Sequence, residues 1–171
     1  GVTLAPRQHL REWRGSKSTS AESLARAVAE YRQRFPDKAV TVSVDGAAGW
    51  AVLAAGVSLP NLPRSTSKRL RTAVAAMKPQ PVRGQTYCLA RPQQQYLAWS
   101  PSKVIQLDLS DAAYRFDVFW IDAATGVAAP ATTQVTGGAI VDLQSPQGGP
   151  AVVWLVRTPV SAAKDRSGLD E

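Results

Sequence analysis

The sequence predicts an α+β protein in which an N-terminal α/β segment is followed by an antiparallel β-sandwich. In the first half, apolar residues recur at helical intervals on either side of one β-branched strand. From Gln85 onward the apolar period becomes two, and short runs are separated by clusters of Pro, Gly, Asp and Ser. Because the period changes near "KPQPVRG", we expect one domain at residues 1–80, a second at 83–158 and a flexible polar tail at 159–171.

The first predicted helix lies within "STSAESLARAVAEYRQRFPDK". Thr19 and Glu22 have the spacing of a capping box, and Pro36 ends the pattern. Leu24 and Val28 lie one helical turn apart, so one face of the helix is apolar. The segment therefore predicts an amphipathic helix that packs against a core.

A strand and two more helices complete the first half. "KAVTVSVDG" has the pattern of a β-branched strand with Asp45 at its C-terminal end. "WAVLAAG" predicts a short buried helix that stops at Gly56, and "STSKRLRTAVAAM" predicts a third helix that Ser65 or Ser67 caps. This order is typical of an α/β unit with a parallel sheet, which one strand cannot form. We therefore expect further strands in a partner chain or in an N-terminal barrel region that precedes this sequence.

The second half contains runs of strand length that predict an antiparallel sandwich or barrel. Alternation along "YRFDVFWID" places Phe116, Val118 and Trp120 on one face and Phe119 on the other. The "DAATG" turn that follows needs Gly126 at positive φ. The predicted strands lie in "TYCLA", "QYLAWS", "KVIQLDLS", "YRFDVFWID", "APATTQVTG", "AIVDLQS" and "AVVWLVR".

Bulk properties narrow the possible functions. With 44% hydrophobic and 19% charged residues the composition is globular, and the longest apolar run is about half of a bilayer crossing. The formal charge of +7 comes from scattered Lys and Arg without interleaved aromatic residues, so we expect neither nucleic-acid nor membrane binding. Cys88 and His9 are the single Cys and His, which excludes an internal disulfide and the usual zinc ligand sets. We expect a buried, inert thiol and no metal or cofactor.

The order of strands and turns in the second half resembles a known module. "TYCLARPQQQYLAWSPSKVIQLDLSDAAYRFDVFWIDAATGVAAP" and the later "VTGGAIVDLQSPQGGPAVVWLVR" resemble the small C-terminal β-sandwich of apiosidase-like and related glycoside hydrolases. That module is named as the collagen-binding domain of a collagenase. The resemblance covers residues 83–157, and Ala123 replaces the proline of the family's "W-[FIY]-[DN]-P-x-T-G" element.

The first half resembles the closing strand and helix of the TIM-type (β/α) barrel that precedes the sandwich in such hydrolases. The resemblance implies a C-terminal segment of a carbohydrate-active glycoside hydrolase, whose accessory sandwich packs on the catalytic barrel and which is inactive alone. It also implies a carbohydrate partner and a secreted or periplasmic location. The alternative is a non-catalytic module that binds a polysaccharide or a protein through aromatic residues of the sandwich.

Candidate site residues follow from these two interpretations. Glycoside hydrolysis needs two carboxyl groups in one cleft, and no complete pair can be named from the sequence. Asp45 is either a substrate contact at the barrel mouth or a turn residue, and Trp50 either stacks on a sugar or packs in the core. Glu12 and Trp13 are candidates for the same mouth, whereas the alternative for Glu12 is a surface salt bridge. The sandwich residues that could serve either sugar stacking or the core are Trp99, Trp120 and Trp154.

Overall fold

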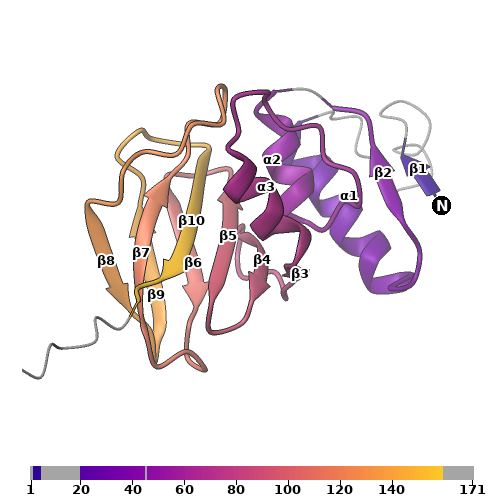
Figure 1. The fold of residues 1–171 in the computed structure, drawn as a ribbon. Coiled ribbons are helices and arrows are strands. Elements are labelled where there is room, and N and C mark those ends of the chain that lie inside the picture. The colour runs from indigo at the N-terminus through magenta and orange to yellow at the C-terminus, as the bar shows by residue number, and fades with distance from the viewer. Residues whose placement is uncertain (1, 5–19, 45, 160–171) are drawn as a thin grey trace, which may run out of the picture.

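The structure, a computed structural model, describes residues 2–4, 20–44 and 46–159 of the chain (Figure 1). The elements of the first half are β1 (Val2–Leu4), α1 (Ala21–Arg34), β2 (Val40–Val42), α2 (Ala48–Ala54) and α3 (Lys68–Ala75). Those of the second half are β3 (Lys78–Pro79), β4 (Tyr87–Arg91), β5 (Gln95–Ser100), β6 (Val104–Asp108), β7 (Arg115–Trp120), β8 (Thr133–Thr136), β9 (Ile140–Gln144) and β10 (Ala151–Arg157).

Helix α1 begins at a serine cap. The Ser20 hydroxyl accepts a hydrogen bond from the Ser23 N–H at 3.2 Å, which satisfies one of the unpaired donors of the first turn. The predicted capping residue, Thr19, lies outside the described residues. The apolar face that the sequence predicted is buried, with Leu24 and Val28 at 6% and 0% exposure. Helix α1 therefore packs as an amphipathic helix.

Strands β1 and β2 form a parallel pair, and α1 connects them in a β-α-β unit. The sequence predicted only β2 here, and β1 supplies the second strand. Val40 and Val42 are buried. On the edge of β2, the Val40 N–H donates to Ser58 Oγ at 3.1 Å, and the Ser58 N–H donates to the Val40 carbonyl at 2.8 Å. A loop residue thus completes the hydrogen bonding of β2 at this point.

The second half forms two antiparallel sheets. One has six strands in the order β3-β4-β5-β10-β7-β8, and the other consists of β6 and β9. All of the strands predicted in this half are present, and β3 is an addition that pairs with β4. Among the described strands the sheets do not close into a barrel, because β3 and β8 are the outer strands of the larger sheet. The fold is α+β with mostly antiparallel sheet, as predicted.

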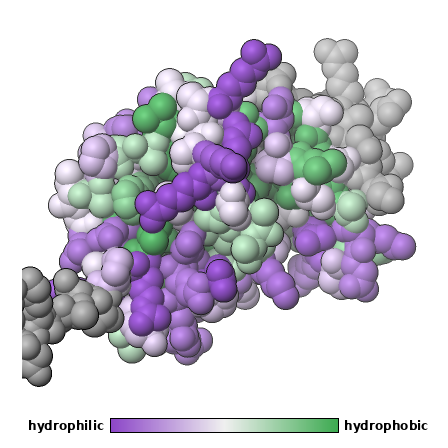
Figure 2. All heavy atoms as spheres, in the orientation of Figure 1, coloured by the Kyte–Doolittle hydropathy of each residue, from purple (hydrophilic) through white to green (hydrophobic). Residues whose placement is uncertain are grey.

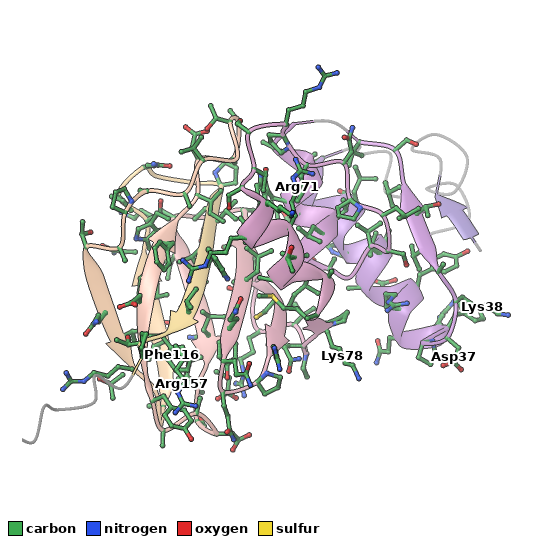
Figure 3. All side chains as sticks on the ribbon, in the orientation of Figure 1. Asp37, Lys38, Arg71, Lys78, Phe116 and Arg157 are labelled. Atoms are coloured by element: carbon green, nitrogen blue, oxygen red, sulfur yellow. The ribbon has the colours of Figure 1, made fainter. Side chains whose placement is uncertain are left out.

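The six-stranded sheet is the middle layer of the molecule. The helices cover its β4-β5 side on one face, whereas β6 and β9 lie behind it (Figure 1). Each face has its own buried cluster, and β7 contributes to both because its side chains alternate. Phe116, which Figure 3 labels, and Val118 belong to the cluster on the β6-β9 side, while Phe119 and Ile121 belong to the cluster on the helical side. The sequence predicted that these two sets lie on opposite faces.

The two remaining helices agree with the sequence prediction. Helix α2 is almost completely buried, and the chain leaves it through Gly56, whose φ is +100°. Helix α3 begins at Ser67, whose hydroxyl accepts from the Leu70 N–H at 3.2 Å. In the part of the chain that the structure describes, no helix is long and apolar enough to cross a membrane.

Candidate functional site

The predicted site residues fall into two groups. Glu12, Trp13 and Asp45 lie outside the described residues, so the structure does not describe the predicted barrel mouth. The other four tryptophans are described, and most of them are buried. Exposure is 0% for Trp50, 1% for Trp99 and 3% for Trp154, whereas Trp120 is half-buried.

Trp50 joins the two halves of the chain. Its ring lies in the buried cluster that α1 and α2 share with the six-stranded sheet. The indole N–H donates to the carbonyl oxygen of Ala123 at 3.0 Å. Ala123 belongs to the "DAATG" turn after β7, so a residue of α2 binds the turn that the sequence analysis singled out. We call the contacts between residues 21–79 and the six-stranded sheet, with this turn, the junction.

The turn has a fixed shape because Asp122 caps it. Asp122 Oδ1 accepts from the N–H groups of Ala124 at 2.9 Å and Thr125 at 2.8 Å. Gly126 has a φ of +76°, as predicted, and its N–H donates to the Asp122 carbonyl at 2.7 Å. These bonds orient the carbonyls of Ala123 and Thr125 toward the first half. The turn residues therefore fix the backbone conformation of the turn and also place its carbonyls in contact with the first half.

A second contact joins the turn to the loop before α3. The Ser65 hydroxyl donates to the Thr125 carbonyl. Gly126 is buried against this loop, since an added Cβ would collide with the Thr66 hydroxyl and lie 3.1 Å from Pro63 Cβ. Sequence reasoning treated Ser65 as an alternative helix cap. Ser67 fills that role, so Ser65 is available to bind the turn.

Arg71 fixes the loop that receives the turn. From α3 it donates to the Pro63 carbonyl at 2.7 Å and to the Thr66 carbonyl at 3.1 Å. Figure 3 labels Arg71 on α3, in the helical half of the molecule. The sequence alone indicated only a basic residue on a helix surface. Its structural role depends on a loop whose carbonyl groups point toward α3 at that place.

A third polar contact links α1 to β4. The Arg26 guanidinium lies close enough to the Tyr87 hydroxyl to interact with it, and it pairs with Glu22 at 3.0 Å. Burial raises the pKa of the Tyr87 phenol, although the nearby guanidinium opposes this shift. Tyr87 also packs against Trp99 at a ring distance of 5.9 Å. No local pattern in the sequence predicted this contact, since the two residues are far apart along the chain.

A cavity of about 290 Å³ lies inside the junction. Its walls come from α1, α2, α3, β3 and β4, and most of them are apolar. Arg32 and Arg71 border it, but both donate to backbone carbonyls, Arg32 to Lys38 at 2.9 Å. Gly56 lies close to the same wall, where an added Cβ would come within 2.5 Å of Pro79 Cγ. We assign these arginines a structural role at this cavity.

The helical side of the sheet beyond α3 is a mixed surface. Arg69 lies over the Trp154 ring at 5.4 Å, and Phe119 packs against the same ring at 5.4 Å. Farther along, Asp117 Oδ1 accepts from Gln134 at 2.8 Å and from a threonine hydroxyl of the C-terminal segment. Figure 2 shows hydrophilic and hydrophobic side chains interspersed on this face. The aromatic residues Phe119 and Trp154 contact each other here, and Arg69 covers the Trp154 ring.

The single cysteine is buried, as predicted. Cys88 has 7% exposure in β4, and burial raises the pKa of its thiol to about 12. A thiol with this pKa is almost entirely protonated at neutral pH and is a poor nucleophile. Cys88 therefore fills space between the sheets.

Asp122 makes the stability of the turn depend on pH. Hydrogen bonds from Thr125, and then from the Ala124 N–H, lower the pKa of the Asp122 carboxyl below its ordinary value of 3.8. Since the folded-state pKa is depressed, this stabilisation is complete above 3.8 and is lost as the pH falls through the folded-state value. We expect Asp122→Asn to lose less stability than the wild type on acidification. Urea unfolding at neutral and acidic pH measures the stability of the wild type and of the variant. If both proteins lose the same stability on acidification, Asp122 does not have this role.

Among the comparisons with known proteins, one solved structure has a similar fold over most of this chain. A family model described as "Domain of unknown function (DUF6298)" matches residues 1–77, and β3 begins directly after this range. The comparison with curated proteins gave no match. A solved structure titled "Glycoside hydrolase" is similar over 80% of this chain and 46% of its own length, with a TM-score of 0.50 and 11% identity. This chain thus spans about half the length of that structure, and the similarity concerns the fold.

Proposed function

We propose that this chain is the C-terminal part of a carbohydrate-active glycoside hydrolase. In this proposal, β1, α1, β2 and α2 are the terminal elements of a TIM-type barrel, and the two sheets form an accessory sandwich that packs on it. The single observation that carries the proposal is the junction. Trp50 is completely buried and binds the "DAATG" turn, so the sandwich is held against the helical half by a specific contact.

The parallel pair supports the barrel interpretation. Parallel strands occur almost only in sheets whose faces are both covered, and two of them do not usually form a sheet of their own. β1 and β2 are joined by α1 with the connectivity of a barrel repeat. The similarity to part of a longer structure titled "Glycoside hydrolase" also favours this proposal. The remaining barrel strands would come from residues outside this sequence.

The proposal assigns hydrolysis to the complete enzyme. Among the described residues of the first half, Glu22 pairs with Arg26 and is committed to the surface of α1. A retaining or inverting mechanism needs two carboxyl groups about 5–9.5 Å apart across the sugar. Asp45, Glu12 or both would contribute to the mouth of the barrel only when the rest of it is present. We therefore propose that the sandwich buttresses the barrel and that this chain alone is inactive.

The test is to express the complete reading frame that encodes this chain, beside the 171-residue chain itself. Both are assayed on a panel of aryl glycosides and plant and bacterial polysaccharides. The proposal expects hydrolysis by the complete protein only, and loss of its thermal stability when the sandwich is deleted. Hydrolysis by the short chain, or no hydrolysis of any panel member by the complete protein, would contradict it.

A further inference from the structure

A second cavity lies in the sandwich, away from the junction. It has a volume of about 320 Å³, at the small end of the range for ligand pockets, which is about 300–1,000 Å³. It opens where β6 passes the start of β4, and the Thr86 hydroxyl of the preceding turn accepts from the Gln106 N–H at 3.1 Å. Cys88 and Tyr96 contribute to the buried side of the cavity. The two sheets and the turns between them therefore form the site.

The cavity is bordered by more acidic than basic side chains. Arg83 pairs with Asp108, and Asp111 borders the same space. Hydrogen bonds from Ser110, and then the Arg83 guanidinium, lower the pKa of the Asp108 carboxyl, so it stays ionised. One cation and two carboxylates leave a net negative charge, which disfavours an anionic ligand. Within the described segments, no group of three or more His, Cys, Asp and Glu side chains is arranged to hold a metal ion.

The other lining groups suit a neutral ligand that has many hydroxyls. Gln80 donates one amide N–H to the Lys78 carbonyl and Gln106 donates one to Asp142 Oδ1, each at 3.1 Å. Each side chain keeps a second N–H donor and a carbonyl acceptor for a ligand. A sugar hydroxyl both donates and accepts hydrogen bonds. The carboxylates can accept from it, the guanidinium can donate to it, and the amides can do either. Leu107 and two prolines, Pro81 and Pro92, provide apolar surface between these polar groups.

The backbone of β6 adds hydrogen-bonding capacity. Along a strand, successive residues direct their N–H and C=O groups to opposite sides. Gln106 directs its N–H to Thr86, whereas Leu109 donates to Ala139 on the β9 side. Asp108, two residues after Gln106, therefore directs its backbone groups to the side of β6 where the cavity lies. A ligand there would meet a strand edge as well as side chains.

We propose that this cavity binds a neutral saccharide unit, with Asp108 and Asp111 accepting from its hydroxyls and Arg83 and the two glutamines completing the contacts. The choice of a saccharide among neutral polyols rests on the proposed function, whereas the cavity and its polar lining do not. The proposal assigns binding, and not hydrolysis, to this cavity. In the complete protein it would hold a part of the polysaccharide beside the barrel.

The test is NMR titration of the 171-residue chain with a panel of neutral sugars. The panel contains glucose, galactose, xylose, arabinose and rhamnose with their disaccharides, each at millimolar concentration. The side-chain NH₂ signals of Gln80 and Gln106 and the Nε–H signal of Arg83 report directly on the cavity. We expect at least one sugar to shift these signals in a saturable way.

Two variants of equal charge change sharpen the test. Asp111→Asn should weaken binding about tenfold or more, since a charge-assisted hydrogen bond is lost. Glu30→Gln, on the exposed face of α1, is the matched control and should bind like the wild type. Unchanged affinity of Asp111→Asn, shifts that map to the helical side of the sheet, or no saturable shift with any sugar would overturn the inference. None of these outcomes bears on hydrolysis by the complete protein, so the two proposals fail separately.

Discussion

Replacement of Trp50 by alanine is expected to lower the free energy of unfolding by about 3–5 kcal/mol, as for other fully buried large side chains. The ring is completely buried between the helices and the sheet, and its indole N–H holds the Ala123 carbonyl. The substitution leaves a cavity and an unpaired acceptor at the junction. Urea unfolding followed by tryptophan fluorescence and by circular dichroism measures the loss.

Trp50→Phe separates the two contributions. It retains most of the packing and removes the indole N–H, so we expect a smaller loss of about 1–3 kcal/mol, the cost of an unpaired buried group. In Trp50→Ala, limited proteolysis should cut within residues 46–79 before it cuts within β4, β5 or β10. A variant with wild-type stability, or one that is cut first in the sandwich, would show that Trp50 does not join the halves.

Gly126→Ala is expected to lower the free energy of unfolding by about 2–4 kcal/mol, which combines a strained backbone with overpacking. Gly126 has a φ of +76°, and an added Cβ would collide with Thr66 and approach Pro63. Both neighbours belong to the loop that Arg71 holds by its carbonyls, so they cannot easily move away. The turn would be displaced from the first half.

Gly138→Ala is the matched control for this substitution. Gly138 also has a positive φ, +94°, but an added Cβ there would meet no atom within 4 Å. In Gly138→Ala only the backbone strain lowers the free energy of unfolding, by about 1 kcal/mol. Thermal unfolding of the two variants compares them directly. If both lose the same stability, the contact between Gly126 and the loop contributes nothing.

Much of the fold follows from local patterns in the sequence. The sandwich strands were predictable because their alternation reflects burial on one or both faces, as Phe116 and Phe119 illustrate on β7. Gly126 was predictable because the turn needs a positive φ. Strands β1 and β3 were not predicted, since neither lies in a longer β-branched run like the "KAVTVSV" that contains the equally short β2.

The junction was not predictable for a different reason. Its contacts join residues that lie far apart along the chain, such as Trp50 and Ala123 or Arg26 and Tyr87. At the level of sequence, a tryptophan on a short apolar helix suits a core position better than a sugar contact, but it allows both. Only the packing of α2 on β4 and β5 decides between them, and it buries Trp50. The cavity beside β6 likewise depends on how the two sheets diverge.

Hydrogen exchange of the wild-type chain tests most directly the claim that the junction makes one folded unit of both halves. If the claim holds, the slowest amides of α2 and those of β5 exchange through openings of the same free energy, and both are lowered together by Trp50→Ala. If the amides of α2 exchange through an opening of lower free energy while those of β5 stay protected, the sandwich folds without the helical half. The junction would then be a contact between independent parts.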